Sequence, residues 1–149
     1  MTGLRNLTLP THEVKVSEGE SFTVRGLSPN DALSLYYRHT GQLSALFDQF
    51  ADKGELERTD INAVASTVVG TAPIVMAEII AIGSGSNPGE AGFMEDVQIA
   101  MSLSAGVQMD ALTKIADLTF TSDMPPGKFA AVVLMLARSA TASLPNPKT

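Results

Sequence analysis

Residues 61–83, INAVASTVVGTAPIVMAEIIAIG, form a long apolar stretch that restricts what this 149-residue chain can fold into more than any other feature. The stretch contains one charged residue, Glu78, and one helix-breaking residue, Pro73. Its length allows a membrane span, since about 20 apolar residues cross a bilayer. The alternative is a helix buried at the centre of a soluble domain, because such a helix is apolar on all sides.

The free energy of inserting this stretch into a membrane is close to zero. Its nine Ile and Val residues contribute roughly −3 to −5 kcal/mol on the insertion scale, and Glu78 opposes them by up to about 2.5–3.5 kcal/mol. The flanks carry no aromatic belt, and no Lys or Arg follows before Lys114. We therefore expect a buried helix, kinked near Pro73, and keep the membrane span as the weaker alternative.

Residues 13–25 predict a β-hairpin. Val14 and Val16 alternate with charged neighbours before a Ser-Glu-Gly-Glu turn, and Phe22 and Val24 alternate after it. Period-two alternation on either side of a glycine-containing turn is typical of a hairpin with one apolar face. A lone hairpin is only marginally stable in water, so this face is expected to dock on helices or on a neighbouring subunit.

Helical patterns follow the hairpin. Ser28 can cap a helix that begins at Pro29, with Asp31 favouring its positive end, and Gly41 marks its end. The sequence thus predicts a mainly α fold, an N-terminal β-hairpin followed by a bundle of five or six helices. The later helices are expected at Leu43–Phe50, at 61–82, at 93–104, after a break at Gly106, and in a last segment with Phe129, Val132, Val133, Leu136 and Ala140 at helical spacing.

The same patterns predict one domain with flexible ends. Residues 1–12 lack periodicity and are expected to be a flexible N-terminal arm, and residues 141–149 a flexible C-terminal tail. Residues 13–140 then form a single helical domain that includes the hairpin. Within it, residues 83–92, GSGSNPGEAG, are expected to be a flexible loop because they contain four glycines and a proline.

No motif predicts catalysis, a cofactor or a metal. The only histidines, His12 and His39, lie far apart in the chain, and His39 is expected to complement the C-terminal end of its helix. The glycines of 83–92 do not fit a phosphate-binding loop. Glu95 and Asp96 point to different sides of a helix and are expected to favour its N-terminus. We therefore expect a protein that is not an enzyme.

The charge and composition of the chain limit the classes of partner and the location that we expect. The net charge of −6 with scattered basic residues argues against nucleic-acid binding. There is no cysteine, and the first residues do not resemble a secretory signal, so a cytoplasmic location is expected. The seven methionines fit either an adaptable binding surface or a core that lacks tryptophan.

Three segments together resemble the tail assembly chaperones of long-tailed bacteriophages, also called pre-tape-measure chaperones. The first is the hairpin and capped helix, VKVSEGESFTVRGLSPNDALSLYYRH, followed by TGQLSALFDQF. The second is the apolar helix 61–82. The third is GVQMDALTKIADLTF, followed by a Gly-Lys-Phe entry into the last apolar helix at 127–137. Their order and spacing cover most of residues 13–138.

The resemblance implies a non-enzymatic, helical assembly factor in the host cytoplasm. Such proteins coat the phage tape measure protein, keep it soluble, help recruit tail tube subunits and self-associate along their client as homo-oligomers. Two apolar sets are candidates for client or self contacts, although most such faces are buried within their own domain. They are the hairpin face Val14, Val16, Phe22 and Val24, and the helix stripe Phe129, Val132, Val133 and Leu136.

A second function is also compatible with this sequence. The chain could be a virion structural subunit, such as a tail completion or adaptor protein. Its hairpin and N-terminal arm would then add strands to neighbouring subunits in a ring.

Overall fold

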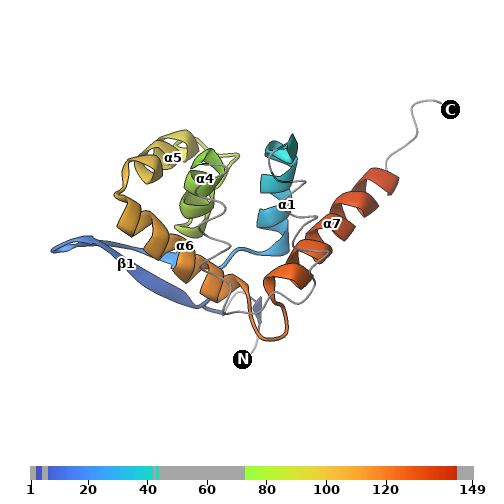
Figure 1. Ribbon diagram of the computed structural model, residues 1–149, viewed down its shortest axis with the longest axis horizontal. Helices are drawn as coiled ribbons and strands as arrows, with labels where there is room; N and C mark the ends of the chain where they lie inside the picture. The colour runs from blue at the N-terminus through green and yellow to red at the C-terminus, as the bar shows by residue number, and fades with distance from the viewer. Residues whose placement is uncertain (1–2, 5–6, 42, 44–72, 144–149) are drawn as a thin grey trace.

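The structure is a computed structural model that describes residues 3–4, 7–41, 43 and 73–143 (Figure 1). The predicted fold class is confirmed: an N-terminal antiparallel hairpin precedes five helices in the described part of the chain. Of the helix predicted at Leu43–Phe50 only Leu43 is described, and it is buried. The described elements are β1 (Thr11–Ser17), β2 (Glu20–Arg25), α1 (Pro29–Arg38), α4 (Pro73–Gly83), α5 (Phe93–Ser102), α6 (Ala105–Thr119) and α7 (Pro126–Ser143).

The hairpin docks on helices, as predicted. Gly19 adopts a positive φ of 81° in the turn, a conformation that glycine enters without steric cost. The register pairs Val14 with Phe22, so these side chains share one face with Val24. Both strands contact α6, and β2 also contacts α4, which buries Val14 and Val24 completely or nearly so. Figure 1 shows the hairpin running along α6.

Helix α1 begins where the sequence predicts. The Ser28 hydroxyl accepts a hydrogen bond from the Asp31 backbone N–H, and the Asp31 carboxylate accepts one from the Ser28 backbone N–H. This reciprocal pair is a capping box, which satisfies two donors that the first helical turn leaves unpaired. Arg25, at the end of β2, donates to the same carboxylate over 2.8 Å. The helix ends at Arg38, before the predicted Gly41, with His39 as its C-cap.

Helix α4 is the described part of the apolar stretch, and it lies at the centre of the domain. It contacts α1, α5, α6 and β2, and residues on all of its sides are buried. A helix that is apolar all round is stable only when it is surrounded in this way. None of the helices in the described part of the chain is long and apolar enough to cross a membrane. Residues 61–72, and with them the predicted kink near Pro73, lie outside the described residues.

The segment after α4 is a helix cap followed by turns. Gly85 has a φ of 109°, its N–H donates to the Ile82 carbonyl, and the Ser86 N–H donates to the Ala81 carbonyl. This pair of bonds is the Schellman motif, which satisfies carbonyl groups left unpaired at a helix end. Helix α5 then begins at Phe93.

The break between α5 and α6 lies two residues earlier than predicted. Leu103 is the C-cap of α5, and Ser104 is the N-cap of α6, where its hydroxyl accepts a hydrogen bond from the Val107 N–H. Gly106, where the break was expected, is inside the first turn of α6. The prediction was wrong because a serine cap begins a helix more effectively than a nearby glycine interrupts one.

Helix α7 packs on α1 and extends to Ser143, three residues beyond the predicted end of the domain. A small cluster joins the two helices, formed by Ala32, Phe129 and Val133. The ring of Phe120, which precedes α7, contacts the Phe129 ring edge-on with centroids 5.5 Å apart. Figure 1 shows α7 at the opposite end of the molecule from the hairpin turn and α5, with its C-terminal end pointing away from them.

Candidate protein-contact surfaces

Glu78, the single charged residue of the apolar stretch, lies against the C-terminal end of α1. Glu78 is only 3% exposed, and its Oε2 lies 3.2 Å from Arg38 Nη2 and 3.0 Å from His39 Nε2. The Arg38 guanidinium also stacks over the Phe93 ring, 4.9 Å from the centroid. Glu78 therefore points neither to solvent nor to a partner protein. A buried carboxylate requires a nearby cation, and α1 supplies one.

Geometry distinguishes the two contacts of Glu78. Arg38 keeps a charge whatever its surroundings, so it is the constant counter-ion. The His39 Nε2 is close to Oε2 but not aligned with it, and among the described residues it has no hydrogen-bond partner. His39 is the C-cap of α1, where its backbone N–H donates to the Leu35 carbonyl, while its imidazole, which was expected to complement the helix dipole, lies beside Glu78. Sequence reasoning missed the contact with Glu78, although a lone charge among apolar residues already indicated a buried partner.

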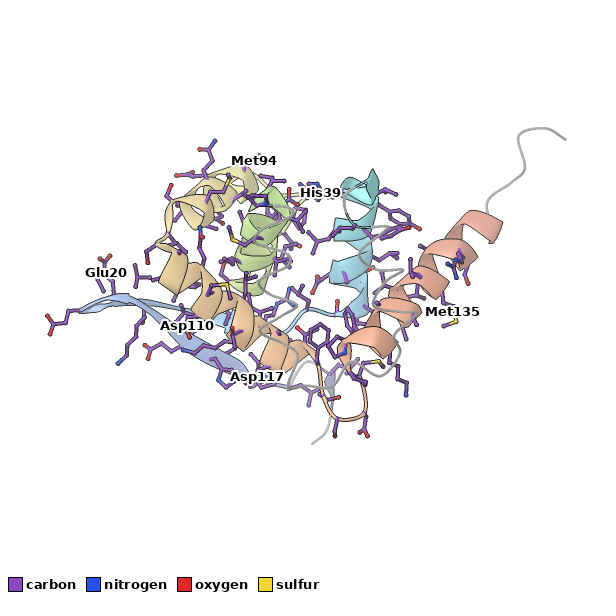
Figure 2. The ribbon with its side chains drawn as sticks, viewed as in Figure 1. Glu20, His39, Met94, Asp110, Asp117 and Met135 are labelled. Atoms are coloured by element: carbon purple, nitrogen blue, oxygen red, sulfur yellow. The ribbon has the colours of Figure 1, made fainter. Side chains whose placement is uncertain are left out.

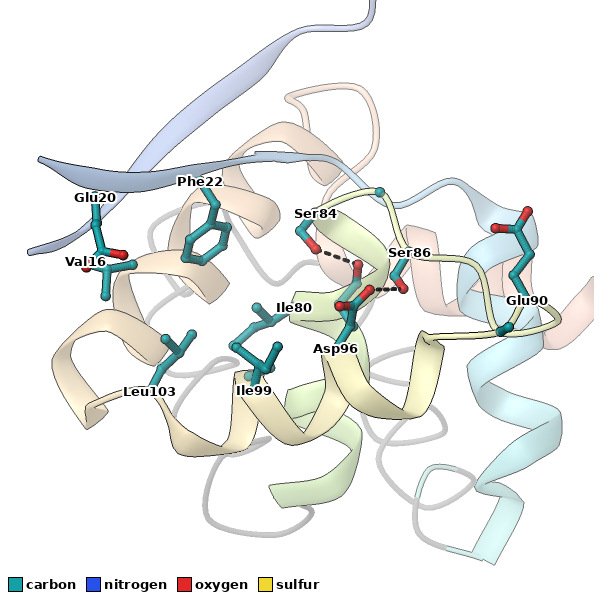
Figure 3. A pocket seen from close by; sticks show the side chains of 14 residues that line it. Val16, Glu20, Phe22, Ile80, Ser84, Ser86, Glu90, Asp96, Ile99 and Leu103 are labelled. Atoms are coloured by element: carbon teal, nitrogen blue, oxygen red, sulfur yellow. Dashed lines mark hydrogen bonds between the residues drawn. The ribbon is translucent and has the colours of Figure 1, made fainter.

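A groove of about 640 Å³ lies between the hairpin, the C-terminal end of α4 and helix α5 (Figure 3). One part of it is apolar, with side chains that converge from three elements. Figure 3 shows Val16 and Phe22 descending from the hairpin toward side chains of α4 and α5. The apolar side chains that line it are Val16, Phe22, Ile80, Ile99 and Leu103.

The other part of the groove is acidic. Glu20, Glu90 and Asp96 line it, and no Lys or Arg is present among the described residues that do so. The Ser86 hydroxyl donates to Asp96 over 2.6 Å, which fixes that carboxylate beside the groove (Figure 3). Asp96 and Glu95 also occupy the first turn of α5, as predicted. The groove thus suits an apolar segment that carries positive charge beside its apolar side chains.

The side of α7 that faces away from the core carries positive rather than negative charge beside its apolar side chains. Phe129, Ala130, Val133, Leu134 and Ala137 turn inward, which leaves Lys128, Val132, Met135 and Leu136 on the other side. Met135 is 58% exposed and Leu136 is 38% exposed. Helix α7 contains Lys128 and Arg138 and no acidic residue. We call Lys128, Val132, Met135 and Leu136 the outer face of α7.

The methionines divide between core and surface. Met76 is buried in α4, whereas Met94 and Met101 on α5 are about half exposed, at 57% and 47%. These two lie seven residues apart and therefore on one side of the helix. Methionine is flexible and polarizable, so an exposed pair adapts to partners of varied shape. The core interpretation is confirmed for Met76, and the binding-surface interpretation stays a prediction for Met94 and Met101.

The structure divides each predicted contact set into a buried half and an accessible half. Val14 and Val24 of the hairpin, and Phe129 and Val133 of α7, are buried in the protein's own core. The remaining residues of the two sets are exposed or half-buried: Val16, Phe22, Val132 and Leu136. Val16 and Phe22 line the groove, and Val132 and Leu136 belong to the outer face of α7.

Within the described residues, no three His, Asp or Glu side chains converge in a way that could hold a metal ion. The accessible features are exposed apolar side chains and the groove with its acidic side. The family model described as the pre-tape measure protein matches residues 2–149. This chain belongs to the pre-tape measure protein family. A search of curated proteins and a search of solved structures each found no match.

Membership of the pre-tape measure protein family confirms the resemblance and makes this chain a phage tail-related protein. In the part of the chain that the structure describes, the exposed large apolar side chains lie on the hairpin, α5 and α7, apart from Leu4, Leu7 and Leu9 near the N-terminus and Tyr37 on α1. Figure 2 shows Met94 and Met135 at separate places on the molecule, with Glu20 near the hairpin turn.

Proposed function

We propose that this pre-tape measure family member is a tail assembly chaperone that binds the phage tape measure protein in the host cytoplasm. It keeps that client soluble and helps recruit tail tube subunits, and it acts by binding and without catalysis. The observation that carries this proposal is the family match over nearly the whole chain. The acidic net charge supports it, because an acidic coat resists association with other acidic molecules.

The exposed methionine pair of α5 is the surface we assign to the client. A long protein with apolar helical stripes aggregates unless those stripes are covered. Met94 and Met101 offer an apolar strip that can adapt to successive, non-identical stripes along such a client. Two acidic residues lie between them in sequence, Glu95 and Asp96, and they keep the strip soluble before the client arrives.

Co-expression with the tape measure protein of the same phage tests the proposal. We expect most of the client in the soluble fraction when this chain is present, and in the pellet when it is absent. An equal distribution of the client in both cultures would refute client binding.

A pair of variants then tests the surface. Met94→Asp together with Met101→Asp is expected to lower the soluble client to near the level without chaperone, since a charge in an apolar contact is costly. Leu9→Asp changes an equally exposed apolar residue elsewhere and should leave the client soluble. If the double variant is as effective as the parent protein, the client binds another face.

Mass spectrometry of finished phage particles separates the chaperone from a virion structural subunit. A chaperone is displaced when the tube polymerises and is expected to be absent from the particles. Stoichiometric recovery of this chain from purified particles would favour the structural alternative.

A further inference from the structure

We propose that the groove between the hairpin, α4 and α5 selects its occupant by charge, and that it binds helical segments of the tape measure protein in which Lys or Arg flanks an apolar stripe. The inference rests on the proposed function and adds to it the chemistry of the client segment that one defined surface accepts. The methionine pair of α5 adapts to apolar segments in general, whereas the groove distinguishes a basic segment from an acidic one.

The groove and the methionine pair lie on different sides of α5. Asp96, Ile99 and Leu103 line the groove and follow one another at intervals of three and four residues, so they share one side of the helix. Met94 and Met101 share another side. The residues that bury α5 against α4 lie between these two sides. A client segment in the groove therefore leaves the methionine pair free for another segment.

The apolar part of the groove offers anchoring positions that exist before a partner binds. Ile99 is 56% exposed and Val16 is 39% exposed, although both lie among the apolar side chains of the groove (Figure 3). Apolar side chains that are left exposed beside one another mark interaction sites. The elements that carry them are fixed by the core, through Val14 and Val24 of the hairpin and through the enclosed helix α4. A preformed groove binds with a smaller loss of conformational entropy.

The acidic side chains of the groove are each held by a neutral donor close to them in the chain. The pairs of donor and acceptor are Ser17 and Glu20 at 3.2 Å, Asn87 and Glu90 at 3.3 Å, and Ser86 and Asp96 at 2.6 Å. Within the residues that the structure describes, none of these carboxylates forms an ion pair with Lys, Arg or His. A neutral donor orients a carboxylate without cancelling its charge, so three oriented negative charges remain available to a cationic partner.

This combination of surfaces determines which segment fits. The carboxylates repel an acidic segment, and a purely apolar segment gains nothing from them. A helix with apolar residues three and four apart presents a row of anchors to a groove. Lys and Arg beside that row reach the carboxylates while their methylene groups cover apolar surface. Among the partners of the proposed function, the tape measure protein is the one that supplies apolar helical stripes.

Peptides from the tape measure protein of the same phage test the selectivity. Overlapping peptides of about 20 residues, long enough to form a helix, are titrated with the purified protein by fluorescence anisotropy. We expect the bound peptides to combine an apolar stripe with Lys or Arg. Replacing those basic residues with Glu should weaken binding at least about tenfold, and added salt should weaken the binding of the basic form. Equal affinity for the basic and acidic forms would overturn the proposal.

Variants of the groove test where the peptide binds. Glu20→Gln with Glu90→Gln removes two groove charges at positions outside the helices, and the dissociation constant is expected to rise about threefold to tenfold. Glu18→Gln with Glu95→Gln is the matched control, because these carboxylates are exposed and do not line the groove. The control should change the dissociation constant less than about twofold. Equal losses in both variants would show a general attraction to an acidic protein and would overturn the proposal.

Charge exchange gives the sharpest measurement. With Glu20→Lys and Glu90→Lys, the preference should reverse, so that the acidic form of the peptide binds more tightly than the basic form. Ile99→Asp should weaken the basic peptide at least about tenfold, with unchanged circular dichroism because the side chain is exposed. Met94→Asp with Met101→Asp lies on the other side of α5 and should bind the peptide as the parent protein does. A preference that does not reverse would contradict the groove as the site.

The full-length client distinguishes failure of this inference from failure of the proposed function. If the parent protein and the Glu20→Gln, Glu90→Gln variant solubilise the client equally and bind the peptides equally, the groove inference is overturned and client binding stands. If neither protein solubilises the client, the chaperone function fails, while peptide binding that depends on these two residues still supports the selectivity of the groove. Peptide affinity that falls as the protein becomes more concentrated would assign the groove to a second copy and overturn the inference.

Discussion

Helices α4 and α7 are both rich in aliphatic residues, mainly Ile and Ala in α4 and Ala, Val and Leu in α7, yet they pack against their neighbours in different ways. Helix α4 is enclosed by α1, α5, α6 and β2, within a core that includes Ile80, Ile82 and Val97. Helix α7 packs on α1 through a cluster whose buried members are Ala32, Phe129 and Val133. A similar composition thus gives a central helix in one case and a peripheral one in the other.

This difference concerns function as well as stability. Segments with few buried contacts open at low free energy, while the central elements open only when the whole protein unfolds. A peripheral helix with an accessible second face can take part in a contact without any change in the core. The central helix is suited to hold the surrounding elements in place.

The largest expected effect is on the central helix. Ile82→Ala should lower the free energy of unfolding by about 2–5 kcal/mol, because Ile82 is almost fully buried and its loss leaves a cavity. Val133→Ala, at an equally buried position of α7, should cost roughly 1–3 kcal/mol. Chemical denaturation measures both values.

Amide hydrogen exchange shows whether the two helices differ in cooperativity. With Val133→Ala, exchange is expected to accelerate in α7 and to change little in α4. With Ile82→Ala, protection should fall throughout the domain. Uniform loss of protection in both variants would mean that α7 is as firmly integrated as α4.

The next effect concerns the close approach between α6 and the connection from β2 to α1. A Cβ atom on Gly26 would lie 2.7 Å from the Leu118 carbonyl carbon and oxygen and 2.9 Å from the Thr119 nitrogen. These are backbone atoms, so Gly26→Ala should cost about 1–3 kcal/mol through forced displacement. It should also weaken the 2.8 Å hydrogen bond from the Leu27 N–H to the Thr119 hydroxyl.

Gly106→Ala is the matched control for that variant. Gly106 lies in the first turn of α6, with open space where its Cβ would be. Alanine has the higher helix propensity, so the change should be neutral or stabilise by up to about 1 kcal/mol. The midpoint temperature of thermal unfolding should therefore fall for Gly26→Ala and stay equal or rise for Gly106→Ala. Equal shifts in the two variants would contradict the close approach.

The sequence predicted the elements near strong local signals and missed features that depend on distant residues. The Ser28 cap and the alternation around Gly19 are local, and the structure contains both features as predicted; the return hydrogen bond from the Ser28 N–H to the Asp31 carboxylate was not predicted. The predicted stripe of α7 is covered along only one side: Phe129 and Val133 are buried, whereas Val132 is half-buried and Leu136 is exposed. The apolar face of α7 is wider than the area that α1 covers, and the sequence alone does not indicate which of its residues α1 buries.

The candidate surfaces were predictable only in part, for the same physical reason. Each predicted set contained residues that proved accessible, Val16 in the hairpin and Leu136 in α7. The groove itself combines side chains from the hairpin, α4 and α5, and nothing in the sequence places these three elements together. The contact of Glu78 with Arg38 and His39 likewise spans about forty residues of chain.

A third prediction concerns the buried charge that joins α1 to α4. Glu78→Gln keeps the shape of the side chain but removes the charge that faces Arg38. The expected loss of stability is about 1–3 kcal/mol, moderated because Arg38 is partly exposed and can reach water. Glu18→Gln, in the exposed hairpin turn, should change stability by less than about 0.5 kcal/mol. Equal stability of the Glu78→Gln and parent proteins would show that the ion pair makes no net contribution.

The smallest effect is at the start of α1 and depends on pH. Burial alone would raise the pKa of Asp31, but the hydrogen bonds from Arg25 and from the Ser28 backbone, together with the charge of Arg25, lower it below its ordinary value of 3.8. A carboxyl group whose pKa is lower in the folded state stabilises the fold above its unfolded pKa. That contribution is lost as the pH falls through the lower, folded-state pKa.

Asp31→Asn is therefore expected to cost about 1 kcal/mol at pH 7, through loss of the ion pair and weakening of the capping box. The difference from the parent protein should stay constant down to about pH 5 and shrink as Asp31 takes up a proton. Urea denaturation at several pH values between 7 and 3 measures this difference. Because α7 packs on α1, the variant should also accelerate amide hydrogen exchange in both of these helices, while the amides of α4 stay protected. A difference that grows on acidification would contradict the lowered pKa.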